Sequence, residues 1–92
     1  MKRIPILKDG ITVTVVGEEY VLFPSYINEK STKISSLNKV GYYIITLIDG
    51  KRTLEEIAKT IATTYKIDIS VAQEDMMQFL TTMEVNDIIF YK

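Results

Sequence analysis

The sequence predicts an α+β fold in which a three-stranded antiparallel sheet is followed by three helices. Two observations predict it. Apolar residues alternate with polar ones in the first third of the chain, and from residue 38 onward they recur at helical spacing. The 92 residues are enough for one domain, and neither a repeat nor a linker-like segment divides them. We therefore expect residues 1–92 to form a single domain.

Three strands are expected before the helices. Residues 11–16 alternate apolar and polar side chains, and residues 20–23 form a second apolar run that Pro24 ends, because proline cannot donate to a strand ladder. Gly17 supplies the turn between them. A third strand is expected at residues 32–35, where Ile34 is the single apolar residue between polar neighbours. That pattern is typical of a half-exposed edge strand.

The first two helices have clear start signals. Asn38 is a good N-cap for a helix that ends at Asp49 and Gly50, with Gly50 expected as a left-handed C-cap. Thr53 and Glu56 have the spacing of a capping box at the start of the second helix. Gly41 lies inside the first helix, where glycine costs about 1 kcal/mol relative to alanine. We therefore expect close packing against another element at Gly41.

The third helix is expected to begin at Asp68 or at Ser70 and to end at residues 86–87. Residues 88–91 then form a short final strand or a docked tail. Met76 belongs to the apolar stripe of this helix, whereas Met77 points about 100° away from it. For this pair, core filling and the lining of an adaptable binding groove are both open.

The composition excludes several classes of function. The chain contains no Cys and no His, which excludes disulfides, Cys/His zinc sites, thiol nucleophiles and His-based triads. Glu55 and Glu56 lie in the first turn of a helix, where acidic residues favour the helix dipole, so capping is the expected role. Lys51 and Arg52 are interpreted as a solvated turn. A binding module without catalytic activity, metal or cofactor is therefore favoured.

The charge and hydropathy patterns narrow the choice of partner. The net charge is −1, whereas nucleic-acid-binding domains usually carry a basic surface. No apolar run approaches the ~18 residues that a membrane span requires. We therefore expect a cytoplasmic protein that binds neither nucleic acid nor membrane.

The third strand is the most suggestive physical feature. An edge with free N–H and C=O groups can accept an extended peptide as an additional strand. The alternative is an edge that Lys30 and Lys33 protect against such pairing. The residues by themselves leave these two interpretations open.

An ordered set of short motifs resembles the PqqD-like family. The family pattern reads Leu-Asn, a spaced Gly or Ala, Leu-x-Asp-Gly, Thr-x-Glu-Glu-Ile, Tyr-x-Val-Asp and Asp-Val-x-x-Phe-Leu. The resemblance covers about residues 11–89. The matching residues in this chain are Leu37-Asn38, Gly41, the run from Leu47 to Ile57, the run from Tyr65 to Asp68, Asp75-Met76 and Phe79-Leu80.

The resemblance implies a single peptide-recognition domain that acts as a non-catalytic adaptor. Such domains bind the leader segment of a ribosomally made, post-translationally modified peptide. They present it to a maturation enzyme, which is a radical S-adenosylmethionine enzyme or a lasso-type protease or cyclase. The leader adds beside the third strand, in the cleft against the third helix. Carried onto this chain, the peptide-binding residues would be Lys30, Ser31, Thr32, Lys33, Ile34, Ser35, Val71, Asp75, Met76, Gln78, Phe79 and Thr82.

Two departures from the family pattern affect the third strand. Ser36 stands where many members carry a large apolar residue, and the segment formed by residues 24–33 is long and polar. Both leave the register of this strand open.

The runner-up function is a winged-helix DNA-binding or regulatory module, because three helices beside a hairpin resemble a winged helix-turn-helix. A third candidate function is that of a subunit that scaffolds an enzyme without contacting its substrate. The open edge also permits a homodimer in the absence of ligand.

Overall fold

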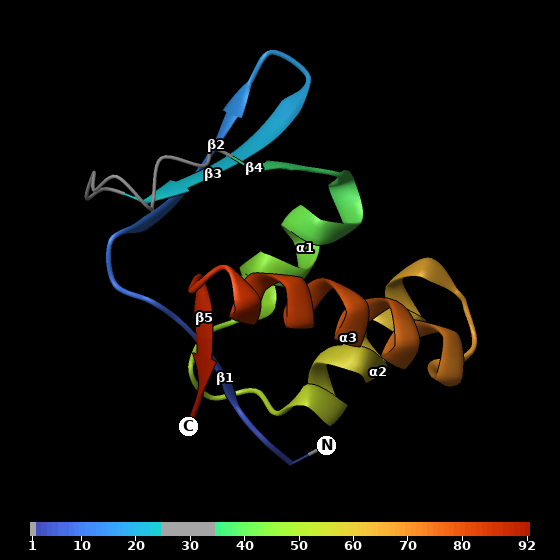
Figure 1. The fold of residues 1–92 in the computed structure, drawn as a ribbon. Helices are drawn as coiled ribbons and strands as arrows, with labels where there is room; N and C mark the ends of the chain where they lie inside the picture. Colours follow the sequence, from blue (N-terminus) through green and yellow to red (C-terminus); the bar gives the residue numbers. More distant parts are fainter. Residues whose placement is uncertain (1, 25–34) are drawn as a thin grey trace.

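The computed structural model describes residues 2–24 and 35–92, and Figure 1 shows its fold. Within these residues the chain forms five strands and three helices, so the α+β class is confirmed. A β-hairpin extends from one end of the molecule, and the helices pack together below it (Figure 1). The elements are β1 (Pro5–Leu7), β2 (Ile11–Val16), β3 (Glu19–Pro24), β4 (Ser35–Leu37), α1 (Lys39–Leu47), α2 (Leu54–Tyr65), α3 (Ile69–Val85) and β5 (Ile89–Tyr91).

The predicted three-stranded sheet has the order β2-β3-β4, and both pairings are antiparallel. A two-residue turn joins β2 to β3, with Gly17 at its first position and φ at 63°. Glycine adopts this backbone conformation without steric cost, and the turn matches the twist of a hairpin. Val16 pairs with Glu19 beside the turn, and this pair fixes the register of the hairpin.

The third strand of this sheet lies at Ser35–Leu37, where it pairs with residues 20–22 of β3. The sequence predicted it at residues 32–35, and Ser35 is confirmed as a strand residue. Residues 32–34 of that prediction lie outside the described residues. The strand extends two residues beyond the predicted end, to Leu37, whose buried side chain anchors it to the core.

A second sheet, which the sequence did not predict, pairs β1 with β5. It brings the two ends of the chain together (Figure 1). The guanidinium of Arg3 lies 4.0 Å from the centre of the Tyr91 ring, in a cation–π arrangement. Partial burial raises the pKa of the Tyr91 phenol, the charge of Glu84 raises it further, and Arg3 lowers it. Of the two alternatives for residues 88–91, a final strand or a docked tail, the structure shows the strand, at Ile89–Tyr91 with β1 as its partner.

The helix start signals work as predicted at α1 and α2. The Asn38 side chain accepts a hydrogen bond of 2.7 Å from the Gly41 N–H. Thr53 and Glu56 form a complete capping box, with reciprocal bonds of 3.0 and 3.2 Å. The N-cap of α3 is Asp68, although its side chain makes no capping hydrogen bond. None of the helices in residues 2–24 and 35–92 is long and apolar enough to cross a membrane.

The predicted C-cap at Gly50 is wrong. Helix α1 ends at Leu47 and its C-cap is Ile48, in an extended conformation. Asp49 provides the physical reason, because its Oδ1 accepts hydrogen bonds of 2.9 Å from the backbone N–H groups of Lys51 and Arg52. Its Oδ2 lies 3.0 Å from the Arg52 guanidinium. Gly50 has φ at 78° and serves this separate turn.

The core lies between the three helices and is closed by residues from both sheets. Its members are apolar, and within the described residues no polar or charged side chain is buried. Met76, at 0% exposure, belongs to the core, which decides in favour of core filling for this residue. The buried residues of this hydrophobic cluster are Leu22, Leu37, Ile44, Ile45, Leu47, Leu54, Ile57, Ala58, Ile61, Ala72, Met76, Leu80, Met83, Ile88 and Ile89.

The capping box at Thr53 provides a stability test. Replacing Thr53 with Ala leaves the Glu56 N–H without its acceptor, and we expect a loss of about 1 kcal/mol in the free energy of unfolding. Chemical denaturation measures it. Thr60→Ala is the matched control, since the Thr60 hydroxyl bonds only a carbonyl of its own helix and alanine favours helices. Equal effects of the two changes would contradict the capping role.

The turn at Asp49 provides a test by pH. The backbone N–H groups of Arg52 and Lys51, together with the Arg52 charge, hold the pKa of Asp49 below its usual value of 3.8. Because the folded-state pKa is lowered, the stability that ionised Asp49 contributes is present above pH 3.8 and is lost as the pH falls through the folded-state pKa. The stability difference between the wild type and Asp49→Asn should therefore shrink in acid. A difference that does not change from neutral pH to pH 2.5 would contradict this account.

Candidate functional site

Strand β4 is paired on one side only, as far as the described residues show. It is the last strand in the order β2-β3-β4, and its only partner among these residues is β3. The strand is three residues long and leads through Asn38 directly into α1. Its open edge therefore continues into the first turn of a helix. That arrangement places an unpaired backbone edge beside the surface formed by α1 and α3.

A groove of about 480 Å³ lies on that surface, between the start of α1 and the middle of α3. One wall comes from α1 and its N-cap, through Asn38, Val40, Gly41 and Ile44. The other comes from α3, whose contributing residues are spaced by three or four positions and therefore share one helical face. They are Asp75, Gln78, Phe79 and Thr82.

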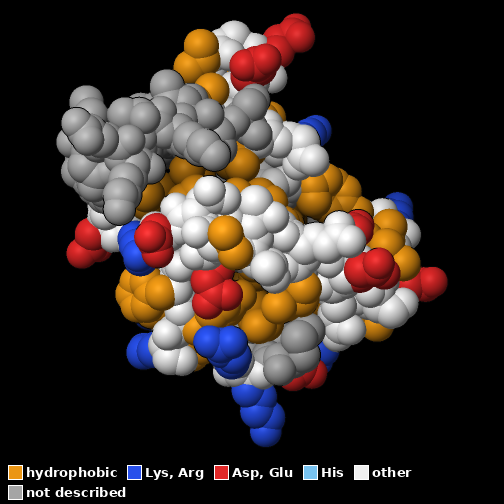
Figure 2. Space-filling model, viewed as in Figure 1, with side chains coloured by type: hydrophobic (Ala, Val, Ile, Leu, Met, Phe, Trp, Pro, Cys, Tyr) orange, Lys and Arg blue, Asp and Glu red, His pale blue; other side chains and the backbone are white. Residues whose placement is uncertain are grey.

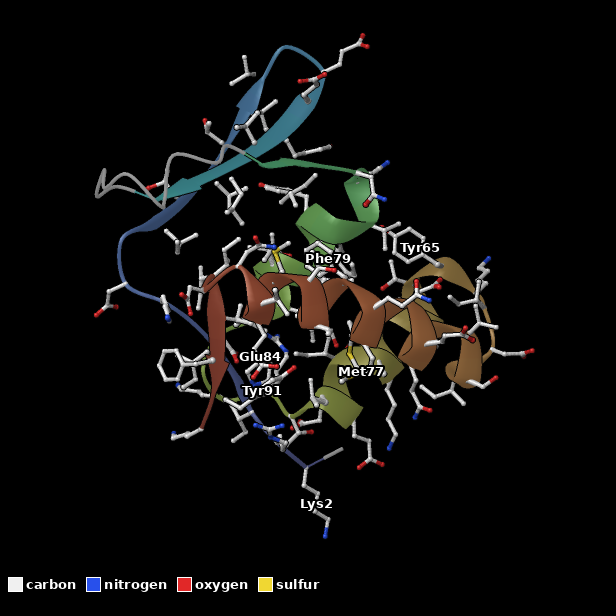
Figure 3. All side chains as sticks on the ribbon, in the orientation of Figure 1. Lys2, Tyr65, Met77, Phe79, Glu84 and Tyr91 are labelled. Carbon is white, nitrogen blue, oxygen red and sulfur yellow. The ribbon has the colours of Figure 1, made fainter. Side chains whose placement is uncertain are left out.

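The contact between Phe79 and Gly41 shapes the floor of this groove. Phe79 is half-buried and projects from α3 towards α1 (Figure 3). A Cβ atom at Gly41 would lie 2.8 Å from Cε1 of the Phe79 ring, closer than real side chains approach each other. Gly41 is thus the close-packing position that its place inside a helix predicted.

The structure brings together four of the twelve predicted peptide-binding residues. Asp75, Gln78, Phe79 and Thr82 line the groove. Val71 is 44% exposed and lies outside the groove lining. The prediction that Met76 forms part of the groove wall is wrong, because its side chain points into the core and is 0% exposed.

The strand residues of the same prediction are only partly described. Ser35 is the first residue of β4, which places its backbone in the edge strand. Five predicted residues lie outside the described residues, and they are Lys30, Ser31, Thr32, Lys33 and Ile34.

The wall formed by α1 was missed as part of the site. Val40 and Ile44 recur at the helical spacing of an apolar stripe, a pattern that they share with ordinary core residues, so the sequence did not predict them as groove residues. Ile44 is indeed 1% exposed, yet it forms the base of the groove. The signal that could have found this wall is Gly41, since a glycine within a helix indicates a neighbouring element at close range.

A second, shallower surface lies on α3 next to the residues that line the groove. It is lined by Glu74, Met77, Thr81 and two residues that it shares with the groove, Gln78 and Thr82. Met77 is half-buried and packs against the core (Figure 3). It therefore differs from Met76 as the helical spacing predicted, and part of its side chain reaches the surface.

Among the described residues, Asp75 supplies the only formal charge in the lining of the groove. Within the same part of the chain Asp75 forms no ion pair. Along its whole length α3 has three acidic side chains and no Lys or Arg. In Figure 2, the basic side chains of this face are spread over its lower part and its sides and do not gather into one large patch.

The comparisons with known proteins agree with the motifs. The model of the family described as coenzyme PQQ synthesis protein D (PqqD) matches residues 26–89, which is more than half of the chain. The chain belongs to the PqqD family. The family resemblance that the sequence motifs indicated is thereby confirmed. No curated protein matches the sequence.

Solved structures with a similar fold include a PqqD truncation and two proteins in complex with leader peptides. The PqqD truncation of Methylobacterium extorquens PqqCD, a stand-alone recognition element, has a TM-score of 0.75 and 19% identity, over 95% of this chain and 88% of its own. TbiB1 in complex with the TbiA(beta) leader peptide has a TM-score of 0.74 and 21% identity, over 91% of this chain and 93% of its own.

A third similar structure is lasso peptide synthetase B1, complexed with its leader peptide. Its TM-score is 0.76 at 16% identity, over 94% of this chain and 96% of its own. At such low identities the three likenesses establish a shared fold that extends over almost the whole chain.

The contact between Gly41 and Phe79 can be tested by a double-mutant cycle. In the wild type, Gly41→Ala should give little or no stabilisation, because the new methyl group must displace the Phe79 ring. After Phe79→Ala the same change should stabilise by about 1 kcal/mol, the difference in helix propensity. Thermal or urea unfolding of the four proteins measures this coupling. The same stabilisation in both backgrounds would contradict the contact.

Proposed function

We propose that this chain is a non-catalytic adaptor that binds the leader segment of a ribosomally made precursor peptide and presents it to a maturation enzyme. The observation that carries the proposal is the open edge of β4 beside the groove between α1 and α3. An edge of this kind supplies backbone hydrogen bonds to an extended peptide, and the groove supplies contacts for its side chains. Family membership supports the proposal, as do two similar folds that contain leader peptides.

The register of the sheet indicates which backbone groups are available. In antiparallel pairs, opposed residues alternate between those that exchange hydrogen bonds and those that do not. The two-residue hairpin makes Val16 and Glu19 a bonded pair. Counting from there along β3 and across to β4, Leu37 and Ser35 direct their backbone groups to β3. The N–H and C=O of Ser36 are then directed to the open edge.

The remaining parts of the proposal concern activity and assembly. Residues 1–92 act as one recognition unit in the cytoplasm and carry out no chemistry. The partner enzyme is a radical S-adenosylmethionine enzyme or a lasso-type protease or cyclase, as the family resemblance implies. In the absence of a leader, the same edge is where two copies of the chain would pair.

The winged-helix alternative receives less support. A hairpin and three helices are present, but a recognition helix requires basic side chains for phosphates and base edges. Helix α3 carries Glu74, Asp75 and Glu84 and has no basic residue. We therefore do not propose nucleic acid as a partner.

Binding is tested directly with the leader peptide encoded beside this gene. Isothermal titration with folded protein should show 1:1 binding. No heat of binding at tens of micromolar, and no change in the amide NMR spectrum, would reject the proposal.

Strand addition is tested by proline at two matched edge positions. Ser36→Pro removes the N–H that faces the open edge of β4. We expect leader affinity to fall at least about fivefold, because a net backbone hydrogen bond is worth about 1 kcal/mol. Val15→Pro is the control, since Val15 holds the corresponding outward position on the opposite edge strand, β2. Circular dichroism checks that both variants fold. Strand addition at β4 would be wrong if both variants bound the leader like the wild type.

A further inference from the structure

The groove beside β4 combines an apolar floor with a single charge. Phe79, Val40 and Ile44 provide the apolar part, and Asp75 is the only charged residue of the lining in the part of the chain that the structure describes. The first-turn N–H of Gly41, which could otherwise attract an anion, already donates to Asn38 at 2.7 Å. The groove therefore has one apolar position and one acidic position for the side chains of a bound peptide.

The spacing of these two positions fits a strand. Asp75 and Phe79 are four residues apart on α3, which is about 6 Å along the helix axis. Alternate residues of an extended chain are about 6.6–6.8 Å apart and point to the same side. A peptide that runs along α3 thus places two side chains separated by one residue over Phe79 and Asp75.

We infer that the groove selects a leader segment in which an apolar residue and a Lys or Arg are separated by one residue, with the basic side chain paired to Asp75. This inference rests on the proposed function and names the specificity that the groove adds to it. Within the described residues Asp75 has no competing ion-pair partner, and α3 contains no basic side chain that would repel the peptide. Affinity from backbone pairing alone would not distinguish such a segment from other extended peptides.

The test uses the leader peptide encoded beside this gene, labelled for fluorescence anisotropy, and a set of variants in which each Lys or Arg is changed in turn to Gln. Asp75→Asn should weaken binding about two- to fivefold, the effect of losing an exposed ion pair. One of the Lys or Arg changes in the peptide should weaken binding to the wild type by the same factor as Asp75→Asn does. The same peptide change should not weaken binding to the Asp75→Asn variant any further. Raising the ionic strength should reduce the difference between the wild type and Asp75→Asn.

Two further variants sharpen the result. Glu74→Gln is the matched control, because Glu74 is the neighbouring acidic residue of α3 but lines the second, shallower surface. It should bind the leader like the wild type. Asp75→Lys should bind poorly, and a leader with Glu at the sensitive basic position should restore its affinity.

The outcomes separate this inference from the proposed function. If the leader binds the wild type but neither Asp75→Asn nor any Lys or Arg change affects affinity, the inference is wrong and the adaptor function stands. A leader that binds tightly without any basic residue has the same meaning. If the wild type does not bind the leader at all, both the adaptor function and the inference are rejected.

Discussion

The close approach of α3 to α1 at Gly41 is the contact on which the candidate site depends. A side chain at this position would meet the Phe79 ring at 2.8 Å, so only glycine lets the ring lie where it does. With the ring in this place, the two helices form the walls of a groove whose floor belongs to the core. Asn38 holds the start of α1 against the same groove through its bond to the Gly41 N–H. Helix capping and helix packing thus meet at one residue.

The edge strand and the groove form one continuous feature. Strand β4 passes into α1 through a single residue, Asn38, so its position is fixed by the sheet on one side and by the helix on the other. Leu37 is buried at the junction and anchors both strand β4 and the start of helix α1. A peptide paired with this edge would therefore meet backbone groups and side-chain contacts in a defined relation. That relation distinguishes a recognition surface from an edge that is merely exposed.

Local signals made much of this fold predictable from the sequence. The caps at Asn38 and Thr53, and the turn at Gly17, depend on residues within a few positions of each other, and the structure confirms all three. Pairings between residues far apart in the sequence were harder to predict. Strand β1 is three residues long and pairs with β5 more than 80 residues later, so no local pattern indicated it.

The site shows the same division. The α3 face with Asp75 and Phe79 followed from family motifs and helical spacing. The α1 wall did not, because Val40 and Ile44 have the pattern of ordinary core residues, and only packing shows that they also reach a groove. Met76 shows a conflict between two kinds of prediction. The helical spacing placed it on the apolar stripe of α3, whereas the family resemblance placed it in the groove wall, and its 0% exposure agrees with the stripe.

The central claim is that a leader peptide pairs with the open edge of β4. The most direct measurement is the hydrogen-exchange rate of individual backbone amides by NMR, with and without the leader peptide. The account predicts that the Ser36 amide becomes protected on binding, whereas the Val15 amide on the opposite edge keeps its rate. A leader that binds at the α1–α3 groove while Ser36 continues to exchange at its free rate would contradict strand addition.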